Sequence, residues 1–528
     1  MGVYLNPGDD KFLMAIQSEI YVDKSEILSR LNCYFRTESR FICVSRPRRF
    51  GKSMTANMVV AYYDRTVNAA ETFKGLKIVN DTSFEKHCNA YDVIQVNMQD
   101  FLSRTNSMDE FLRSLKKRLL FDLLKEYSDI DCYDPNDLIE TMSDIYANTN
   151  RPFVIIIDEW DAVFREYKGR KDWQEKYLDF LRAWLKDKNY VGLAYMTGIL
   201  PIKKYGTHSA LNMFNEFSME NPGKLAEFVG FTKDEVEALC KKYNVNYEEC
   251  KAWYDGYSFA AYGVKEVYNP RSVVCAMENG VFDNYWNKTE TFEALKIYID
   301  LNFDGLKEAI IALMSGEHYR VNTKNFTNDM STFNDKDDVL TLLIHLGYLG
   351  YDFNTSSVFI PNQEVLTEYA NSVRSADWQT VAEAVKTSEE LLESALSMNS
   401  EKVAEYIDSA HLETSYLTYN DENALAYTIS LAFYTARRKY LIVREFPTGK
   451  GFADIVYLPR PTHLNLPAMI VELKWDKSAK TAIRQIKEKQ YIHALKDYTG
   501  KVLLVGINYD KTSRKHSCEI EEFEINSK

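Results

Sequence analysis

With 528 residues and 45% apolar content, the chain is about three times the size of a usual domain and has enough apolar side chains for two or three buried cores. Its eight cysteines lack CxxC pairs and metal-ligand spacing, which argues against a disulfide framework and a zinc ribbon and favours the cytoplasm. No signal-peptide pattern and no apolar run near the roughly 20 residues of a membrane span are present, so we expect no membrane partner; the net charge of -13 disfavours nucleic acid for the chain as a whole.

The first predicted element is a strand-to-helix turn of the kind that binds phosphate. Phe41 to Val44 is typical of a short buried strand, and the chain from Ser53 onward is typical of a helix. The turn between them contains Arg46, Pro47, Arg48, Arg49, Phe50, Gly51, Lys52 and Ser53. In a P-loop, backbone N–H groups hold the phosphates, Lys52 reaches the outer phosphates and the Ser53 hydroxyl ligates Mg²⁺. The arginines contact phosphate or pin the loop to carboxylates, and the sequence leaves both open.

A second element is needed, because GK followed by Ser also occurs by chance in ordinary turns. Phe153 to Ile157 is a run of five apolar residues, typical of a parallel strand buried on both faces, and it ends at Asp158 and Glu159. Asp158 is predicted to hold magnesium, and Glu159 to polarise the water that attacks the terminal phosphate. The alternative is an ordinary solvated strand end. Together with the P-loop, this strand predicts binding of ATP or a related nucleotide.

Further apolar strands at Val93–Val96 and Val191–Met196, with helical stretches such as Leu112–Tyr127 between them, predict an α/β fold with a doubly wound parallel sheet. Thr197 follows the last of these strands. A polar residue there senses the terminal phosphate in many ATPases, although a threonine at a strand end is also commonplace.

The runs SRPRRFGKSM, FVIIIDEWD, TGILPIKKYG, WYDGYSF and VYNPRSV resemble the bacterial predicted AAA-ATPase-like family over about the first half of the chain. The resemblance implies an arginine, here Arg46, in place of the first P-loop glycine, and a signalling or switch ATPase more than an unfoldase ring. We expect this P-loop domain over residues 1–223. Residues 224–400 are mostly helical by pattern and are expected to form a lid and connector.

The C-terminal pattern begins with a helix from Asp421 to Tyr434, on which Glu422 shares a stripe with apolar residues. Three strands follow, at Tyr440–Arg444, Phe452–Leu458 and Ala468–Lys474. In the third strand, Glu472 and Lys474 are two residues apart and project from one face, and Asp454 in the second strand is expected nearby. Burying charges placed this way destabilises the fold unless they are paired with each other or with a bound ion.

This arrangement suits a divalent-metal nuclease, in which Asp454 and Glu472 bind magnesium and Lys474 positions the nucleophile or steadies the transition state. With the preceding GKGFAD run and the following Gln485, residues 401–528 resemble the PD-(D/E)XK nuclease superfamily. The resemblance implies a restriction-endonuclease-like α/β domain in which Glu422 is the acid of the leading helix, and Gln485 and Tyr491 belong to the trailing helix. Ala453 replaces the proline of the usual motif, which leaves activity as a separate question.

A basic segment supports a nucleic-acid partner for this domain. The window 437–515 holds 17 Lys and Arg against 7 Asp and Glu, and the predicted helix from Lys477 to Tyr491 carries several of them. Such a face provides salt-dependent phosphate contacts, although a solvated charged face is the alternative.

The preferred hypothesis is a cytoplasmic, ATP-binding and ATP-hydrolysing protein that regulates a DNA nuclease, with ATP and Mg²⁺ as cofactors and Mn²⁺ as a second option at the nuclease site. One rival is a switch ATPase whose C-terminal domain binds nucleic acid without cleaving it, and another is a mechanical remodeller. The sequence does not decide between DNA and RNA, identify an arginine finger, or choose between a monomer and a homo-oligomer.

Overall fold

The computed structural model describes residues 2–202, 211–286, 305–314, 316–326, 333–375, 379–412, 425, 429, 433, 436, 439–448, 451–459, 463–489, 491 and 500–525. The chain divides into two compact units. The first comprises Met1–Lys307 with His318–Glu368, and the second comprises Glu308–Glu317 with Tyr369–Lys528. The division into three domains expected from the sequence stays a prediction.

The first unit is built on a parallel sheet of five strands in the order β2-β3-β4-β1-β5. The strands are β1 (Phe41–Ser45), β2 (Asp92–Asn97), β3 (Phe153–Asp158), β4 (Val191–Gly198) and β5 (Asn215–Phe217). Every residue of β1, β3 and β4 is buried, as expected for strands covered on both faces. The predicted parallel sheet is therefore confirmed, and β4 separates the strand before the P-loop from the strand that ends in acids.

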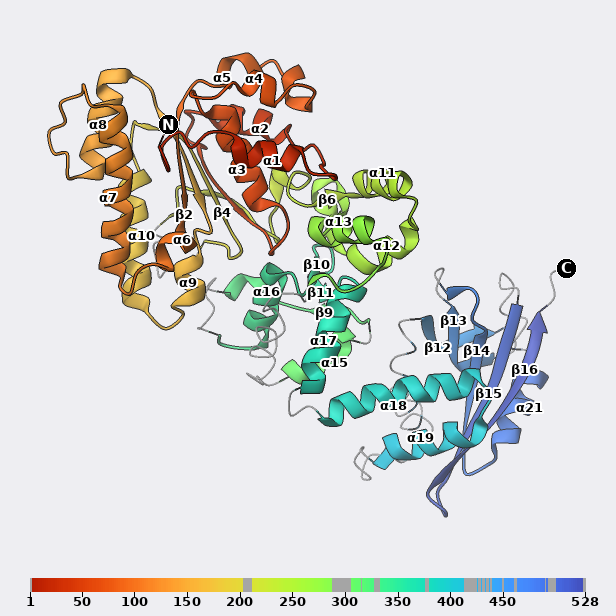
Figure 1. Ribbon diagram of the computed structural model, residues 1–528. Helices are drawn as coiled ribbons and strands as arrows, with labels where there is room; N and C mark the ends of the chain where they lie inside the picture. The colour runs from red at the N-terminus through yellow and green to blue at the C-terminus, as the bar shows by residue number, and fades with distance from the viewer. Residues whose placement is uncertain are drawn as a thin grey trace. The chain divides into compact units, whose positions relative to one another are not determined.

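Helices cover both faces of this sheet, with α3 on one side and α7 and α10 on the other (Figure 1). The helices are α1 (Asp10–Ile16), α2 (Ile27–Tyr34), α3 (Lys52–Tyr63), α4 (Ala69–Thr72), α5 (Phe84–His87), α6 (Met98–Leu102), α7 (Met108–Glu126), α8 (Leu138–Thr149), α9 (Ala162–Glu166) and α10 (Lys171–Leu185). This layering agrees with the doubly wound fold expected from the alternation of strands and helices.

The region after β5 contains small sheets as well as helices. Its helices are α11 (Lys233–Tyr243), α12 (Tyr247–Tyr254), α13 (Pro270–Asn279), α16 (Lys336–Leu346) and α17 (Gln363–Ser375). Its strands are β6 (Phe231–Thr232), β7 (Tyr257–Phe259), β8 (Val264–Tyr268), β9 (Tyr319–Arg320), β10 (Gly350–Asp352) and β11 (Ser357–Phe359), in sheets ordered β6-β8-β7 and β10-β11-β9. The mostly helical pattern missed these strands, and all except β8 are too short, at two or three residues, to show a period of two.

The start of α13 is fixed by local chemistry. The Asn269 side chain accepts hydrogen bonds from the backbone N–H groups of Arg271 and Ser272, at 3.0 and 3.3 Å. Pro270 occupies the first helical position, where its missing N–H costs nothing. The cap therefore fixes the residue at which α13 begins, and with it the positions of the side chains in the first turn.

The second unit contains a five-stranded sheet in the order β12-β13-β14-β15-β16, in which β14 and β15 are parallel and the other pairs are antiparallel. The strands are β12 (Tyr440–Thr448), β13 (Gly451–Pro459), β14 (Ala468–Trp475), β15 (Gly500–Asp510) and β16 (Lys515–Ile525). The three predicted strands are confirmed, whereas β15 and β16 were not predicted. The helices are α18 (Gln379–Leu396), α19 (Ser400–Leu412) and α21 (Ala479–Glu488), and α15 (Leu306–Met314) crosses the boundary between the units.

Alternation along β14 divides the core of the second unit into two layers. Met469 and Val471 pack in the cluster that includes residues of α18 and α19, whereas Ile470 packs with Ile483 and Ile486 of α21. Even-numbered positions of β14 therefore face α21, which is the face that also carries Glu472 and Lys474.

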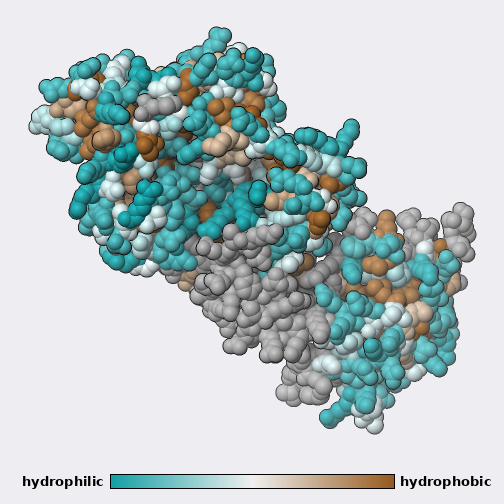
Figure 2. Space-filling view, in the orientation of Figure 1, coloured by the Kyte–Doolittle hydropathy of each residue, from teal (hydrophilic) through white to brown (hydrophobic). Residues whose placement is uncertain are grey.

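The visible surface is mainly hydrophilic over both units, with smaller apolar areas (Figure 2). Among the helices of the described part of the chain, none has the length and apolar character needed to cross a bilayer.

Candidate nucleotide and metal sites

The P-loop has the backbone that phosphate binding requires. Gly51 immediately precedes α3 and adopts a left-handed conformation with φ of 88°, which favours glycine. Lys52 is the first residue of α3 and is buried, and its Nζ donates to the carbonyl oxygens of Arg46 and Pro47 at 2.9 and 2.8 Å. Burial lowers the pKa of Lys52, and the nearby carboxylates of Glu159, Asp161 and Asp158 oppose this effect. The Lys52 ammonium group is therefore bound by carbonyl oxygens of its own loop, with the three carboxylates nearby.

Arg46 points into the protein core, and Arg46 and Pro47 do not line the pocket. Its guanidinium is fully buried, donates through Nη1 to the carbonyl oxygens of Ser45 and Phe217 at 2.9 and 2.8 Å, and lies over the Phe259 ring at 5.2 Å. Burial lowers the pKa of Arg46 to about 10. The Arg46 side chain therefore joins β5 to the loop through carbonyl groups. Because the guanidinium points away from the pocket, only the backbone of Arg46 is left to contact a phosphate.

The carboxyl ends of β3 and β4 meet at the predicted acids. The Thr197 hydroxyl donates to Oδ1 of Asp158, and the backbone N–H of Glu159 donates to the same oxygen at 3.0 Å. Asp158 is only 5% exposed, and neither it nor Thr197 lines the pocket directly. Glu159 does line the pocket and has φ of 51°, a conformation that is uncommon for glutamate. Asp158 and Thr197 thus form a hydrogen-bonded pair beside Glu159.

Arg165 in α9 is a charged residue of this site that the sequence reasoning missed. Its Nη2 donates to Oε2 of Glu159, and its Nε lies 3.4 Å from Oδ2 of Asp161. Asp161 is fully buried and accepts hydrogen bonds from the backbone N–H groups of Ile199 and Leu200 at 3.0 and 2.8 Å. Arg165 is therefore held between two carboxylates, one of which is anchored to the end of β4.

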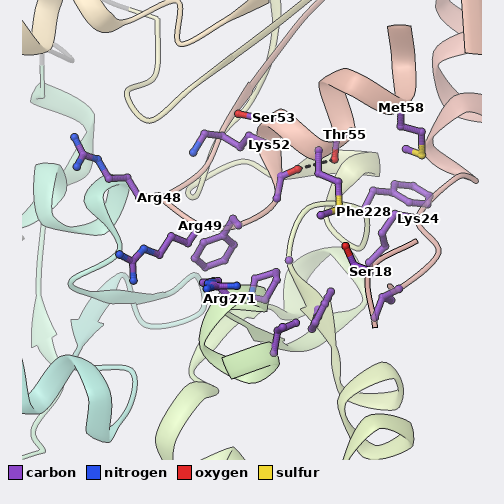
Figure 3. Close-up of a pocket in the computed structure, with 18 of the residues that line it drawn as sticks. Ser18, Lys24, Arg48, Arg49, Lys52, Ser53, Thr55, Met58, Phe228 and Arg271 are labelled. Atoms are coloured by element: carbon purple, nitrogen blue, oxygen red, sulfur yellow. Dashed lines mark hydrogen bonds between the residues drawn. The ribbon is translucent and has the colours of Figure 1, made fainter. Parts of the chain in front are cut away.

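A pocket of about 870 Å³ extends from the P-loop to α13. It is lined by residues 48–55, by Glu159 and Arg165, and by apolar side chains that include Ile20, Met58, Phe228 and Val274. Lys52 and Ser53 lie at the beginning of α3, and Arg271 comes from α13 below them (Figure 3). The lining thus combines cations, among them Lys52 and Arg271, with apolar side chains, a combination that suits the phosphates and base of a nucleotide. Arg271 lies in the VYNPRSV run that carries part of the family resemblance, but the sequence did not place that run beside the P-loop.

The charged cluster of the second unit brings together residues predicted from three segments. Lys474 Nζ donates to Glu472 Oε1 at 2.8 Å, and Nε2 of Gln485 on α21 donates to the same oxygen. Tyr491 Oη lies 3.3 Å from that Nε2. Asp454 accepts the backbone N–H of Leu473 at 2.7 Å, which places it beside the same stretch of β14.

Glu472 has a raised pKa, and one of its two carboxylate oxygens has no hydrogen-bond partner among the described residues. Burial, and secondly the charge of Asp454, raise the pKa of Glu472 to about 7, and the hydrogen bond from Lys474 opposes the shift. Oε2 of Glu472 is buried and accepts no hydrogen bond from the described residues. A cation bound between Glu472 and Asp454 would satisfy this oxygen, and carboxylate oxygens are ligands that Mg²⁺ and Mn²⁺ accept. The donor set therefore fits a divalent ion.

The predicted nuclease motif also includes an acid on the leading helix. Glu422, predicted from the leading helix, lies outside the described residues. Within the described part of the chain, no three His, Cys, Asp or Glu side chains are grouped to hold a metal. Asp454 and Glu472 are thus a pair of carboxylates, and the role of Glu422 stays a prediction.

The basic helix α21 is strongly amphipathic, with Ala479, Ala482, Ile483 and Ile486 buried. Part of its positive charge is paired, because Lys487 forms an ion pair with Glu521, and Arg484 Nε lies 3.8 Å from Glu488. Lys477 and Lys480 are exposed near the start of the helix. The described residues form no ion pair with Lys477 or Lys480, whereas Arg484 and Lys487 each face a glutamate.

The comparisons with known proteins agree with both resemblances. Residues 11–207 match the model of a family described as Predicted AAA-ATPase, and residues 421–519 match the model of the PD-(D/E)XK nuclease superfamily. No curated protein matches the chain.

Similar solved structures include the Aeropyrum pernix ORC2 protein in ADPNP-ADP complexes, with 11% identity and a TM-score of 0.28, and Cdc6p from Pyrobaculum aerophilum, with 10% identity and a TM-score of 0.26. Each comparison covers 70% of this chain and 98% of the other.

Proposed function

The chain joins an AAA-ATPase-like domain to a domain of the PD-(D/E)XK nuclease superfamily, and on that premise we propose that it binds and hydrolyses ATP to regulate a metal-dependent DNA nuclease. The observation that carries the nuclease assignment is the buried Glu472 carboxylate, whose Oε1 is engaged by Lys474 and Gln485 while Oε2 accepts no hydrogen bond from the described residues. A carboxylate left half-satisfied in a protein interior is costly unless a ligand completes it. The cytoplasm is the proposed location.

In the first unit, the proposed roles follow the contacts of each side chain. Lys52 exchanges the carbonyl oxygens of Arg46 and Pro47 for the outer phosphates, because charged phosphate oxygens are stronger acceptors. Asp158 holds a magnesium ion together with Ser53, and Thr197 orients the Asp158 carboxylate. Bound magnesium would supply charge neutralisation at the terminal phosphates.

Glu159 is the proposed base that orients the attacking water, because it lines the pocket near Lys52 and its backbone N–H is hydrogen-bonded to Asp158. Arg165 holds one oxygen of that carboxylate, so it determines where the other oxygen points. These two residues are thus proposed to act as a pair.

In the second unit, Asp454 and Glu472 hold the proposed metal ion, and Lys474 and Gln485 orient Glu472 from the opposite side of its carboxylate. The bound ion would supply activation of water and neutralisation of the scissile phosphate. The exposed Lys477 and Lys480 are proposed to contact the DNA backbone, with an affinity that falls as salt concentration rises.

The test is cleavage of labelled single- and double-stranded DNA by the full chain with Mg²⁺ or Mn²⁺. Glu472→Gln keeps the size of the side chain and removes the charge, so we expect cleavage to be lost while ATP binding is retained. Glu488→Gln, at an exposed glutamate of α21, is the matched control and should cleave as the wild type does. Equal cleavage by the Glu472→Gln and wild-type proteins would exclude the assignment.

The alternative is a switch ATPase whose C-terminal domain binds nucleic acid without cleaving it. The ion pair between Lys474 and Glu472 favours this alternative, because it already compensates part of the buried charge. Salt-sensitive DNA binding by the full chain, with no Mn²⁺ binding that depends on Glu472, would support it.

A further inference from the structure

Glu364 on α17 is a buried carboxylate that neither proposed reaction uses. It is fully buried, and its Oε1 accepts the backbone N–H groups of Tyr285 and Trp286 at 2.8 and 2.9 Å. Its Oε2 accepts the Ser272 hydroxyl at 2.9 Å. One side chain therefore fixes two segments that are far from it in the sequence, the first turn of α13 and the residues 285–286.

Both segments lead directly to the nucleotide pocket. The carbonyl oxygen of Tyr285 accepts a hydrogen bond from Nη1 of Arg49, a P-loop residue that lines the pocket and has φ of 69°. Ser272 immediately follows Arg271, which lines the pocket from α13. In Figure 3, the Arg49 side chain extends from the loop away from α3, and Arg271 lies on the α13 side of the pocket. Glu364 is thus one hydrogen-bonded group away from Arg49 and one residue away from Arg271.

Close packing makes this connection stiff. A Cβ atom on Gly347 would come within 2.7 Å of Pro47 in the P-loop and 2.8 Å of the Trp286 ring, so these three residues are in close contact. The Phe50 ring meets the Tyr257 ring edge-on at 5.2 Å, and the Tyr257 hydroxyl donates to the Gly347 carbonyl oxygen at 2.6 Å. Because these side chains are closely packed, a displacement of the P-loop would also displace the residues around 285–286.

The helix that carries Glu364 continues past the boundary of the first unit. Glu364 and Glu368 belong to the first unit, whereas the residues of α17 from Tyr369 to Ser375 belong to the second. Asn284 donates to Glu368, so α17 is attached to the 284–286 segment at two successive turns. A helix transmits a displacement at one turn to the next because its backbone hydrogen bonds are continuous.

We propose that Glu364 is a positioning residue of the nucleotide pocket, which orients Arg49 through Tyr285 and the first turn of α13 through Ser272, and that it links the pocket to α17. This inference rests on the proposed nucleotide site and deepens it by naming the element that would carry its state. When phosphates attract the Arg49 guanidinium, its hydrogen bond to the Tyr285 carbonyl oxygen breaks and the hydrogen bonds on Glu364 readjust. When the nucleotide leaves, Arg49 again donates to the Tyr285 carbonyl oxygen.

The test combines two measurements on full-length protein, at a temperature at which all variants are folded. The variants are Glu364→Ala, Glu364→Gln, Arg49→Ala and the double variant Arg49→Ala with Glu364→Ala. The first measurement is the Kd for a slowly hydrolysed ATP analogue. We expect Glu364→Ala to weaken binding about tenfold and Glu364→Gln to restore it, because the amide accepts the same backbone N–H groups. The loss in the double variant should be smaller than the sum of the two single losses, because part of the effect of Glu364 acts through Arg49.

The second measurement is backbone amide exchange of the nucleotide-free protein, which does not depend on ATP binding. We expect Glu364→Ala to accelerate exchange at residues 285–286 and in the loop 47–50, and Glu364→Gln to leave both near wild type. Unchanged exchange in the loop 47–50, or free-energy effects of Arg49→Ala and Glu364→Ala that add independently, would overturn the inference. Wild-type protein that does not bind ATP would instead contradict the proposed function, and the exchange result would still decide on Glu364.

Discussion

Lys474 Nζ and Glu472 Oε1 lie 2.8 Å apart in a buried ion pair, and the second oxygen of the same carboxylate accepts no hydrogen bond from the described residues. The lysine therefore compensates one oxygen and leaves the other for a ligand. An unpaired buried acceptor destabilises the folded state, so a cation bound at this oxygen would be stabilising.

The first prediction concerns metal binding at this pair. Mn²⁺ or Mg²⁺ should raise the melting temperature of the wild-type protein, because a ligand that binds only the folded state stabilises it, by about 2.7 kcal/mol at one hundred times its Kd. Glu472→Gln should remove the manganese-dependent shift that arises at this site. Calorimetry with and without the metal measures it, and Glu488→Gln is the control. An equal shift in Glu472→Gln would place the metal elsewhere.

The second prediction concerns Lys52, which is buried in the P-loop and donates to two loop carbonyls. Lys52→Met should weaken ATP binding at least about tenfold, which corresponds to about 1.4 kcal/mol, because the phosphates lose a charged donor. Lys74→Met, at a lysine whose side chain is 76% exposed, should leave the Kd unchanged. Titration calorimetry with an ATP analogue provides the comparison, and equal affinities of the Lys52→Met and wild-type proteins would contradict the P-loop assignment.

The third prediction separates binding from hydrolysis at Glu159. Glu159→Gln should retain ATP binding and lower turnover by about 10² or more, the usual contribution of a positioned base. Arg165→Met should also lower turnover, since it releases the carboxylate that Arg165 holds. In the Glu159→Gln background, the loss of Arg165 should have little further effect on turnover. Faster turnover in Arg165→Met would mean that the arginine restrains the glutamate instead of placing it.

The fourth prediction follows from the burial of Glu364, which raises the pKa of its carboxyl group to about 7 from an ordinary value of 4.5. Between these values the folded chain holds a proton that the unfolded chain has released. The contribution of this group to the free energy of unfolding therefore falls as pH rises from about 4.5 to 7, by about 3 kcal/mol at most, and is constant above that range.

Glu364→Gln cannot release this proton, so its stability should depend less on pH than that of the wild type. Urea unfolding of both proteins at pH 5 and pH 8 measures the difference, and the variant should gain relative to the wild type at pH 8. Glu237→Gln, at an exposed residue, controls for the substitution itself. Parallel pH curves for Glu364→Gln and wild type would show that Glu364 does not titrate in this range.

Much of the fold was predictable because its signals are local. The apolar run from Phe153 to Ile157 defines β3, and the alternation that places Glu472 and Lys474 on one face of β14 follows from the period of a strand. The strand β15 was missed although its apolar run resembles those of the predicted strands.

The rest depends on contacts between distant segments. The inward direction of Arg46 is set by Phe217 and Phe259, which the sequence does not place beside the loop. Arg271 reaches the pocket only because α13 packs against it, and Glu364 gains its partners through a fold that joins residues about 80 to 90 positions apart. Arg271 lies in the VYNPRSV run that carries part of the family resemblance, but a local run does not show which distant residues it meets, so only the structure identifies these contacts.

The central claim, that nucleotide state regulates the nuclease, is tested most directly by DNA cleavage with Mn²⁺ in the presence and absence of ATP. The proteins to compare are wild type, Lys52→Met, which should not bind ATP, and Glu159→Gln, which should bind without hydrolysing it. We predict that ATP changes the cleavage rate of the wild-type protein, that Lys52→Met gives one rate under both conditions, and that Glu159→Gln stays in the ATP-bound behaviour. Cleavage by the wild-type protein at one rate with and without ATP would contradict the claim and leave the two domains as independent activities.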